Sequence, residues 1–447
     1  MRKGYHDLNR PEILNLIPTT AKSIIDLGCG TGTLGKALKE KQPCHVTGIE
    51  LDREAVNTAC LNLDKVIQDN LNRYDPTLID KKYDCIILAD ILEHLIAPWA
   101  ILKKFANVLE ANGTVIASIP NIAHPWIISQ LQKGLFRYEL AGILDITHLR
   151  FFTKTTIGQL FYKAGLKIKV ITPWPNEKSP IQYHVTATKP VLEHKNPLTT
   201  ILILTHNAWN STAQCIASIK SVTEIPYKIL VIDNGSTDGT VEHLRQDNAI
   251  YHIENSHNTG FACGFNIGLG LVDTPYFVIS NSDVVMTKGW LKRMSEHLSE
   301  KPDLMAIGPR SNYVSGPQIV RGCAYNTAQG LIDFAAQFDK GNMDPAVFIK
   351  RIVFFCTLFK KEVLSKVGFL DEIFENGNYE DDDYCIRIHK KGFKCAIDNT
   401  VFIHHYGSQT FKQNKMDFAK IMERNGQRFM TKWRFNNLQE YYRYLST

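Results

Sequence analysis

The sequence lacks both a long hydrophobic run and closely spaced cysteine pairs. It contains no stretch of about 18 apolar residues, as a membrane-spanning helix needs, and its first residues lack the apolar core of a signal peptide. The ten cysteines are scattered without any CxxC spacing, so neither a zinc site nor a disulfide framework is predicted. Reduced thiols and the missing leader together indicate a cytoplasmic protein.

The composition also lacks a strong bias. With 447 residues, 44% of them hydrophobic and 21% charged, the chain resembles a soluble enzyme and is too long for a single core. A net charge of +6 is mild, and we expect no nucleic-acid partner. The positive charge gathers near the C-terminus, where a solvated helix face and peripheral contact with the inner face of the cell membrane, or with a phosphorylated acceptor, both remain open. The basic residues there are Lys412, Lys415, Lys420, Arg424, Arg428, Lys432 and Arg434, opposed only by Asp417 and Glu423.

A polar segment bracketed by prolines divides the chain. It follows an alternating strand pattern at Ile181–Thr188 and precedes an apolar strand pattern at Thr200–Leu204. We therefore predict two α/β domains. Their expected bounds are 1–190 for the first domain, 191–198 for the linker, 199–435 for the second domain and 436–447 for a C-terminal tail.

The first half opens with a strand, a glycine-rich turn and a helix. An apolar strand beginning at Ser23 runs into the turn Gly28–Gly32, and Thr33–Lys41 has a helical pattern. A second strand, His45–Leu51, carries Glu50 about twenty residues past the turn. Such glycines let the backbone approach a ligand, and an acid at the next strand end can hold ribose hydroxyls. The pattern alone suits either a dinucleotide or S-adenosylmethionine.

The spacing within the turn distinguishes these two ligands. A dinucleotide fingerprint needs glycine where Thr33 stands, whereas this sequence has Asp-x-Gly-x-Gly-x-Gly ending at Gly32. Here the chain resembles the class I S-adenosylmethionine-dependent methyltransferases, which implies a Rossmann-like fold. Tyr83–Leu95, Asn112–Asn121 and Thr147–Thr153 extend the resemblance over about residues 10–190. It implies a methionine-side pocket shaped by Asp26, Gly28, Gly30 and Gly32, a ribose contact at Glu50 and an adenine contact at Asp69.

The resemblance identifies no base for methyl transfer. Because the sulfonium methyl group is already activated, such an enzyme needs mainly alignment of its substrates. His94, His124 and His148 are candidates for a base, but a structural or surface role is favoured for each.

In the second half, a short apolar run ends abruptly in polar residues. Tyr276–Ile279 reads as a buried strand, and Ser280-Asn-Ser-Asp283 follows it. Asn281 and Asp283 stand two residues apart on an extended segment and should face the same way. Their oxygens suit a hard divalent cation at a substrate diphosphate, although an Asx-rich turn explains the stretch equally well.

Further motifs surround this strand. Another strand, Lys228–Asp233, places Asp233 at its carboxyl end, where open parallel sheets bind ligands. From Thr205 to Ser408 the order of motifs resembles the family 2 glycosyltransferases of the GT-A fold, in their rhamnosyltransferase-like branch. The matching segments are Thr205–Asn207, Val231–Thr240, Asn258–Ala262, Asn281–Asp283, Glu380–Arg387 and His404–Ser408.

The resemblance implies roles for these residues. Asp283 would hold a divalent cation, Mn²⁺ or Mg²⁺, with His405 favoured over His404 as its partner. Asn281 replaces the second aspartate of the two-aspartate motif. Asp381, beside Glu380, would be the base for the acceptor hydroxyl, although Asp382 competes for that assignment. The nucleotide-sugar contacts would be Thr205, Asn207, Asp233, Asn234, Asn258, Gly260, Phe261 and Asn281.

Together these resemblances predict a bifunctional enzyme of cell-surface polysaccharide or O-antigen biosynthesis. One half would methylate, and the other would transfer a sugar with inversion from a UDP- or dTDP-sugar to a glycan or lipid-linked acceptor. One alternative is a glycosyltransferase with a non-catalytic methyltransferase-like scaffold. A sugar-phosphate nucleotidyltransferase is disfavoured, because the loop after the first strand, Asn207–Ala213, has no basic residue for a triphosphate.

Overall fold

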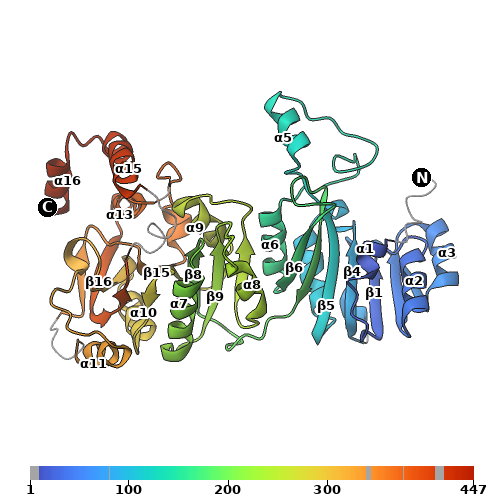
Figure 1. Ribbon diagram of the computed structural model, residues 1–447, viewed down its shortest axis with the longest axis horizontal. Helices are drawn as coiled ribbons and strands as arrows, with labels where there is room; N and C mark the ends of the chain where they lie inside the picture. The colour runs from blue at the N-terminus through green and yellow to red at the C-terminus, as the bar shows by residue number, and fades with distance from the viewer. Residues whose placement is uncertain (1–9, 80, 339–343, 376, 408–416, 447) are drawn as a thin grey trace. The chain divides into compact units, whose positions relative to one another are not determined.

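The computed structural model describes residues 10–79, 81–338, 344–375, 377–407 and 417–446. The chain divides into two compact units, Met1–Val191 and Leu192–Thr447, and each contains its own β-sheet with helices packed against it (Figure 1). The second unit begins with residues 192–198, which form no helix or strand.

The first unit has a seven-stranded sheet of order β3-β2-β1-β4-β5-β7-β6. Its strands pair in parallel from β3 to β5, and β7 pairs antiparallel with both β5 and β6. The elements are α1 (Pro11–Leu14), β1 (Ser23–Leu27), α2 (Thr33–Lys41), β2 (His45–Glu50), α3 (Arg53–Asn62), β3 (Lys65–Gln68), η1 (Pro76–Leu78), β4 (Tyr83–Ala89), η2 (Leu92–His94), α4 (Pro98–Ala106), β5 (Leu109–Pro120), α5 (Pro125–Gln132), α6 (Lys154–Lys163), β6 (Lys167–Trp174) and β7 (Gln182–Thr188).

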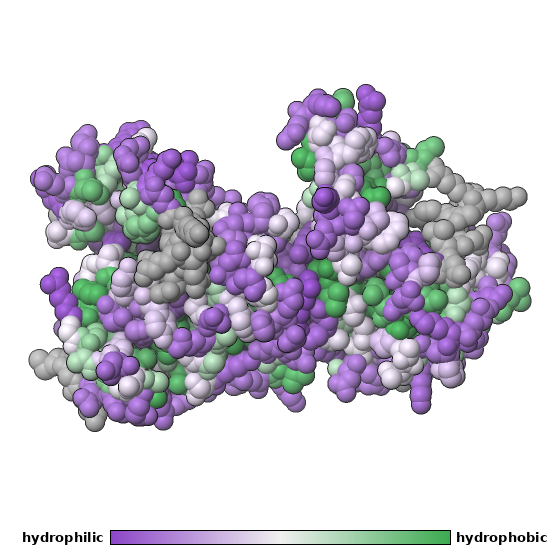
Figure 2. Space-filling model, viewed as in Figure 1, coloured by the Kyte–Doolittle hydropathy of each residue, from purple (hydrophilic) through white to green (hydrophobic). Residues whose placement is uncertain are grey.

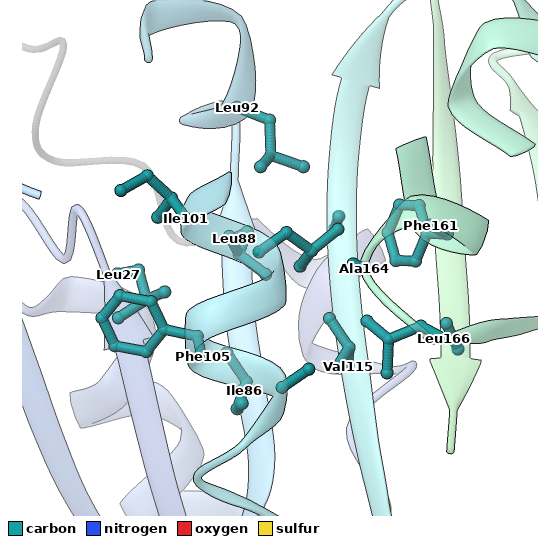
Figure 3. Close-up of a cluster of buried hydrophobic side chains, with 14 of the residues drawn as sticks. Leu27, Ile86, Leu88, Leu92, Ile101, Phe105, Val115, Phe161, Ala164 and Leu166 are labelled. Atoms are coloured by element: carbon teal, nitrogen blue, oxygen red, sulfur yellow. The ribbon is translucent and has the colours of Figure 1, made fainter. Parts of the chain in front are cut away.

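The core of this unit lies between its central strands and helices α4 and α6. Figure 3 shows Leu88 and Val115 of the sheet beside Phe105 of α4 and Phe161 of α6, all of them fully buried. A central parallel strand is covered on both faces, which explains why β4 is apolar along nearly its whole length. One segment of the unit carries exposed apolar side chains from Trp126 to Leu140, and Figure 2 shows hydrophobic residues among hydrophilic ones where α5 projects.

The second unit has an eight-stranded sheet of order β10-β9-β8-β11-β15-β13-β16-β14 and a separate two-stranded ribbon, β12-β17. Strands β10, β9, β8 and β11 pair in parallel. The elements are β8 (Thr199–Thr205), α7 (Trp209–Val222), β9 (Tyr227–Asp233), α8 (Thr240–Gln246), β10 (Tyr251–Glu254), α9 (Phe261–Leu269), β11 (Tyr276–Asn281), β12 (Val284–Val285), α10 (Trp290–Glu300), β13 (Leu304–Arg310), η3 (Gly316–Gln318), α11 (Ala328–Phe338), β14 (Ala346–Ile349), β15 (Cys356–Lys360), α12 (Val363–Lys366), α13 (Glu380–Lys390), β16 (Lys394–Phe402), β17 (His404–His405), α15 (Phe418–Trp433) and α16 (Leu438–Ser446).

Both sheets reverse their strand order at one central strand. In the first unit β1 lies between β2 and β4, and in the second β8 lies between β9 and β11. Open α/β sheets bind ligands beyond the carboxyl ends of the strands at such a point. The ends of these strands and the loops after them carry the glycine turn, Glu50, Asp233, Asn281 and Asp283.

The C-terminal region is more than the tail that the sequence predicts. Residues 438–446 form helix α16, and Tyr441 is buried against Phe374, Ile386 and Phe429. Three basic residues of α15 have acidic partners: Arg424 and Arg428 pair with Glu375, and Lys432 pairs with Asp371 and Asp383. These pairs hold α15 against its own unit, and Lys412 and Lys415 lie outside the described residues. None of the helices in the described segments is long and apolar enough to cross a membrane.

Candidate functional sites

The glycine turn of the first unit is a tight backbone cradle between β1 and α2. Gly28, Gly30 and Gly32 all have positive φ, of 77°, 54° and 76°. A Cβ atom at Gly28 would come within 2.7 Å of Ile91 in the loop after β4, so a side chain there is excluded by space as well as by backbone conformation.

Two buried acids stand behind this turn. Glu50, at the end of β2, accepts hydrogen bonds from the backbone N–H of Gly30 at 2.9 Å, of Leu51 at 2.8 Å and of Asp52 at 2.9 Å. Burial raises the pKa of Asp26 to about 7; Arg10 opposes this rise and Glu50 adds to it. Asp69 is exposed in the loop after β3, where its side chain accepts from the N–H of Asn70.

The three histidines weighed as bases have different surroundings. The Nδ1 atom of His124 caps α5 through the N–H of Trp126, and its Nε2 atom lies 2.7 Å from the Ser179 hydroxyl, so this side chain has a structural role. His94 and His148 lie together, with ring centroids 4.7 Å apart.

In the second unit, Asp233 ends β9 with one carboxylate oxygen hydrogen-bonded and the other buried. Its Oδ2 atom accepts from the N–H groups of Gly235 and Ser236, at 3.2 and 3.0 Å. Its buried Oδ1 atom has no hydrogen-bond partner among the described residues. Burial raises the pKa of Asp233. A buried unsatisfied acceptor at a strand end fits the hydroxyl or N–H group of a bound nucleotide.

Two asparagines predicted to contact the nucleotide-sugar also hold loops together. Asn234 donates to Asn258 and to the carbonyl of Gly260, and its oxygen accepts from Asn255 and Thr259. The side-chain oxygen of Asn207 accepts from the N–H of Thr237 at 2.7 Å, which joins the loops after β8 and β9. Neither Asn207 nor Asp233 is among the described residues that line the cavity of this unit.

That cavity, of about 910 Å³, brings most of the predicted residues of the second unit together. Strand β8 contributes Thr205, whose hydroxyl lies 2.7 Å from that of Thr212. Gly260 has a φ of 84° and lets α9 begin at Phe261 beside the cavity. The predicted residues that line it are Thr205, Asn234, Asn258, Gly260, Phe261, Asn281, Asp283, Glu380, Asp381 and His405.

The β12-β17 ribbon determines which histidine faces Asp283. Val284 pairs with His405, and the Nε2 atom of His405 lies 3.2 Å from Asp283 Oδ1. Asn281 reaches the same nitrogen at 3.3 Å, so Asn281 and Asp283 face the same way, as predicted. His404 points elsewhere, with its Nδ1 atom 2.7 Å from the Tyr325 hydroxyl. Of the two histidines, only His405 is placed to share a cation with Asp283.

The surroundings of His405 are those of a metal ligand. Its Nδ1 atom lies 2.8 Å from the carbonyl oxygen of Tyr313, which can only accept, so Nδ1 carries the proton and Nε2 carries the lone pair. Metal-binding histidines commonly donate their second N–H in this way. The ring also stacks on Phe355, with centroids 5.3 Å apart. One carboxylate, one imidazole and a nearby amide therefore fit a divalent cation.

The four acids at the start of α13 divide into two pairs. Asp382 pairs with Arg351 and accepts from the Tyr441 hydroxyl, and Asp383 pairs with Arg387 and Lys432. Glu380 and Asp381 are buried beside the cavity. Burial and the neighbouring acids raise the pKa values of both, that of Asp381 to about 7. A carboxylate with such a pKa can act as a general base. Asp382 instead has a structural role, because it forms an ion pair with Arg351.

Sequence reasoning missed the contribution of the C-terminal helices to this site. Side chains of α15 and α16 line the cavity, and Tyr441 bonds directly to the acid run. Arg351, which precedes β15, was missed as well. Neither residue belongs to a local motif, and only the folded chain brings them to Asp382.

Comparison with known proteins identifies the two units. Residues 1–169 match the family model of a methyltransferase domain, and residues 200–368 match that of glycosyl transferase family 2. The chain thus carries a methyltransferase domain followed by a family 2 glycosyltransferase domain. The second match ends before Asp381 and His405. The roles considered for these two residues therefore depend on the geometry described above.

Individual relatives cover parts of the chain. A glycosyltransferase of Haemophilus influenzae, described as uncharacterized, is 32% identical over 116 residues, which are 25% of this chain and 36% of that protein. A ubiquinone biosynthesis O-methyltransferase of Xylella fastidiosa is 25% identical over 221 residues, 43% of this chain and 85% of that protein. The solved mannosyltransferase PcManGT from Pyrobaculum calidifontis is 17% identical with a TM-score of 0.37, and the match covers 53% of this chain and 68% of that one. This similarity is too low to transfer the sugar or the metal of that enzyme.

Proposed function

We propose that the protein is a bifunctional enzyme of cell-surface polysaccharide or O-antigen biosynthesis. Its second unit transfers a sugar with inversion from a UDP- or dTDP-sugar to a glycan or lipid-linked acceptor, using a divalent cation, Mn²⁺ or Mg²⁺. Its first unit transfers a methyl group from S-adenosylmethionine. The domain bounds 1–190 and 199–435, extended to include α16, are part of this proposal.

One observation supports the proposal for the second unit: Asp283, His405 and Asp381 line the same cavity. Asp283 and His405 stand on the β12-β17 side, and Asp381 stands at the start of α13. A bound cation would neutralise the charge that develops on the leaving diphosphate. Asp233 and Thr205 would contact the base and ribose of the nucleotide, and Asn281 would support the cation pair.

The acid run supplies the proton chemistry. Inversion requires the acceptor hydroxyl to attack from the face opposite the leaving group, and a carboxylate there takes its proton. Asp381 would accept that proton, with Glu380 beside it. Arg351 fixes the side chain of Asp382 by an ion pair, and its charge also holds the pKa of Asp381 below the value that burial alone would set.

In the first unit, the chain's residues would mainly bind and align. The turn from Gly28 to Gly32 would hold the methionine side of S-adenosylmethionine, with Asp26 behind it. Glu50 already accepts three backbone N–H groups, and its carboxylate has about four lone-pair positions in all, so a ribose hydroxyl can still be accommodated. Asp69 is exposed near the expected adenine position.

Calorimetric titration of the full chain tests the proposal. S-adenosylhomocysteine should bind saturably without metal, and either UDP or dTDP should bind more tightly with Mn²⁺ than without it. GDP serves as the comparison nucleotide. If no nucleoside diphosphate binds, the proposal for the second unit is wrong; if S-adenosylhomocysteine alone fails to bind, the first unit is a scaffold.

A single substitution provides the matched control. Asp283→Asn should abolish the effect of Mn²⁺ on diphosphate binding. It should leave S-adenosylhomocysteine binding unchanged, because that ligand binds to the first unit and Asp283 belongs to the second. A metal effect that survives this substitution would remove Asp283 from the cation site.

A further inference from the structure

The first unit contains a buried carboxylate that the proposed function does not use. Glu93, in η2 after β4, is 1% exposed, and neither of its carboxylate oxygens has a hydrogen-bond partner among the described residues. Burying an ionised carboxylate without a partner costs several kcal/mol. Such a group is expected to neutralise itself with a proton or to pair with a cation.

Two histidines meet this carboxylate. One potential ligand atom from each of Glu93, His94 and His148 lies within 4.8 Å of the other two. His94 follows Glu93 in the chain, whereas His148 comes from a distant loop. The backbone carbonyl of Glu93 accepts from the N–H groups of Leu149 and Arg150, at 2.8 and 3.0 Å, which fastens that loop beside η2.

A backbone carbonyl fixes the tautomer of each imidazole. The Nδ1 atom of His94 lies 3.2 Å from the carbonyl oxygen of Thr147, and that of His148 lies 2.9 Å from the carbonyl oxygen of Ile143. Because a carbonyl only accepts, Nδ1 carries the proton in each ring and Nε2 carries the lone pair. Backbone carbonyls that fix the tautomer of metal-binding histidines are a common outer layer of metal sites.

We propose that Glu93, His94 and His148 form a divalent metal site in the methyltransferase unit. Two imidazole nitrogens and one carboxylate suit zinc or a neighbouring first-row transition ion better than Mg²⁺ or Ca²⁺, which favour oxygen ligands. Three protein ligands leave further coordination positions open. The site belongs to a different unit from Asp283 and His405, and it does not depend on the function proposed above.

Cobalt(II) titration of the full chain tests this site, because bound Co²⁺ absorbs visible light. The substitutions Asp283→Asn and His405→Asn are introduced first, so that the glycosyltransferase unit contributes no signal. This double variant should bind one Co²⁺ saturably, and Zn²⁺ should displace it. Adding Glu93→Gln or His148→Asn should weaken Co²⁺ binding at least about tenfold, since even outer partners of metal ligands are worth that much.

His45→Asn in the same background is the matched control, because His45 is an exposed histidine of the same unit outside the cluster. It should leave Co²⁺ binding unchanged. Equal Co²⁺ affinity in the Glu93, His148 and His45 variants would overturn the proposal. If the Glu93 and His148 variants do not fold, the double variant alone decides, because the absence of saturable Co²⁺ uptake there contradicts the site.

Discussion

The carboxylates at the glycine turn of the first unit and those at the cavity of the second have different surroundings. In the first unit, the carboxylate of Glu50 is surrounded by backbone N–H groups and braces the turn. In the second, Asp233 keeps a buried oxygen without a partner among the described residues, and Asp381, whose pKa is raised to about 7 like that of Asp26 in the first unit, lines the cavity. Glu50 therefore shapes the backbone of the turn, whereas the charges of Asp233 and Asp381 can change when a ligand binds.

The difference follows from the two chemistries. A methyl sulfonium is already reactive, so its enzyme mainly has to place it. A sugar diphosphate leaves with growing negative charge while the acceptor loses a proton, so its enzyme needs both a cation site and a base. Substitutions that preserve shape but remove charge should therefore affect the second unit more than the first.

The largest effect is expected from Asp381→Asn in the second unit. The amide keeps the shape of the side chain but cannot take the acceptor proton, so glycosyl transfer should fall at least about 10²-fold. Calorimetry should show nucleoside diphosphate binding intact. Asp333→Asn, an exposed aspartate of α11, is the control and should leave turnover unchanged. Full turnover in the Asp381 variant would remove this residue from the role of base.

The pH dependence of glycosyl transfer tests the same carboxylate without a mutation. Burial raises the pKa of Asp381 from 3.8 to about 7, and only the deprotonated carboxylate can accept a proton. The value of kcat/KM should therefore rise about tenfold per pH unit below pH 7 and level off above it. Arg351 lowers this pKa, so Arg351→Gln should move the rising limb to higher pH. A profile already level at pH 5 would contradict the assignment.

In the first unit, Glu50→Gln should weaken S-adenosylhomocysteine binding about tenfold. The amide nitrogen that this substitution introduces would have to face one of the N–H groups that Glu50 now accepts, and a hydrogen bond to a charged group is worth about 1.5–3 kcal/mol. Calorimetry measures the change, and Glu54→Gln on the exposed side of α3 is the control. Unchanged affinity would show that the backbone of the turn suffices.

The sequence predicted the parts of these sites that local patterns encode. The helix Thr33–Lys41 was predicted with its observed bounds, and the strand patterns around Asp233 and Asn281 are confirmed as β9 and β11. Glycine spacing and abrupt changes from apolar to polar residues carry this information within a few positions.

The remaining features depend on contacts between distant segments. The choice of His405 over His404 follows from the pairing of β12 with β17, which are more than a hundred residues apart. The loop-bracing role of Asn234 depends on Asn255 and Thr259, and the separation of Asp381 from Asp382 depends on Arg351 and Tyr441. No local period encodes these partners.

The smallest expected effect concerns the helix that the sequence presented as a tail. Tyr441→Phe removes the hydroxyl that donates to the buried carboxylate of Asp382, which should cost about 2 kcal/mol. The thermal transition of the second unit can be recognised because UDP with Mn²⁺ should raise it, and this transition should fall in the variant while that of the first unit stays. Tyr442→Phe, at the more exposed neighbour, should change neither. An unchanged transition in the Tyr441 variant would mean that α16 contributes only apolar packing and that Arg351 holds Asp382 without help from this hydroxyl.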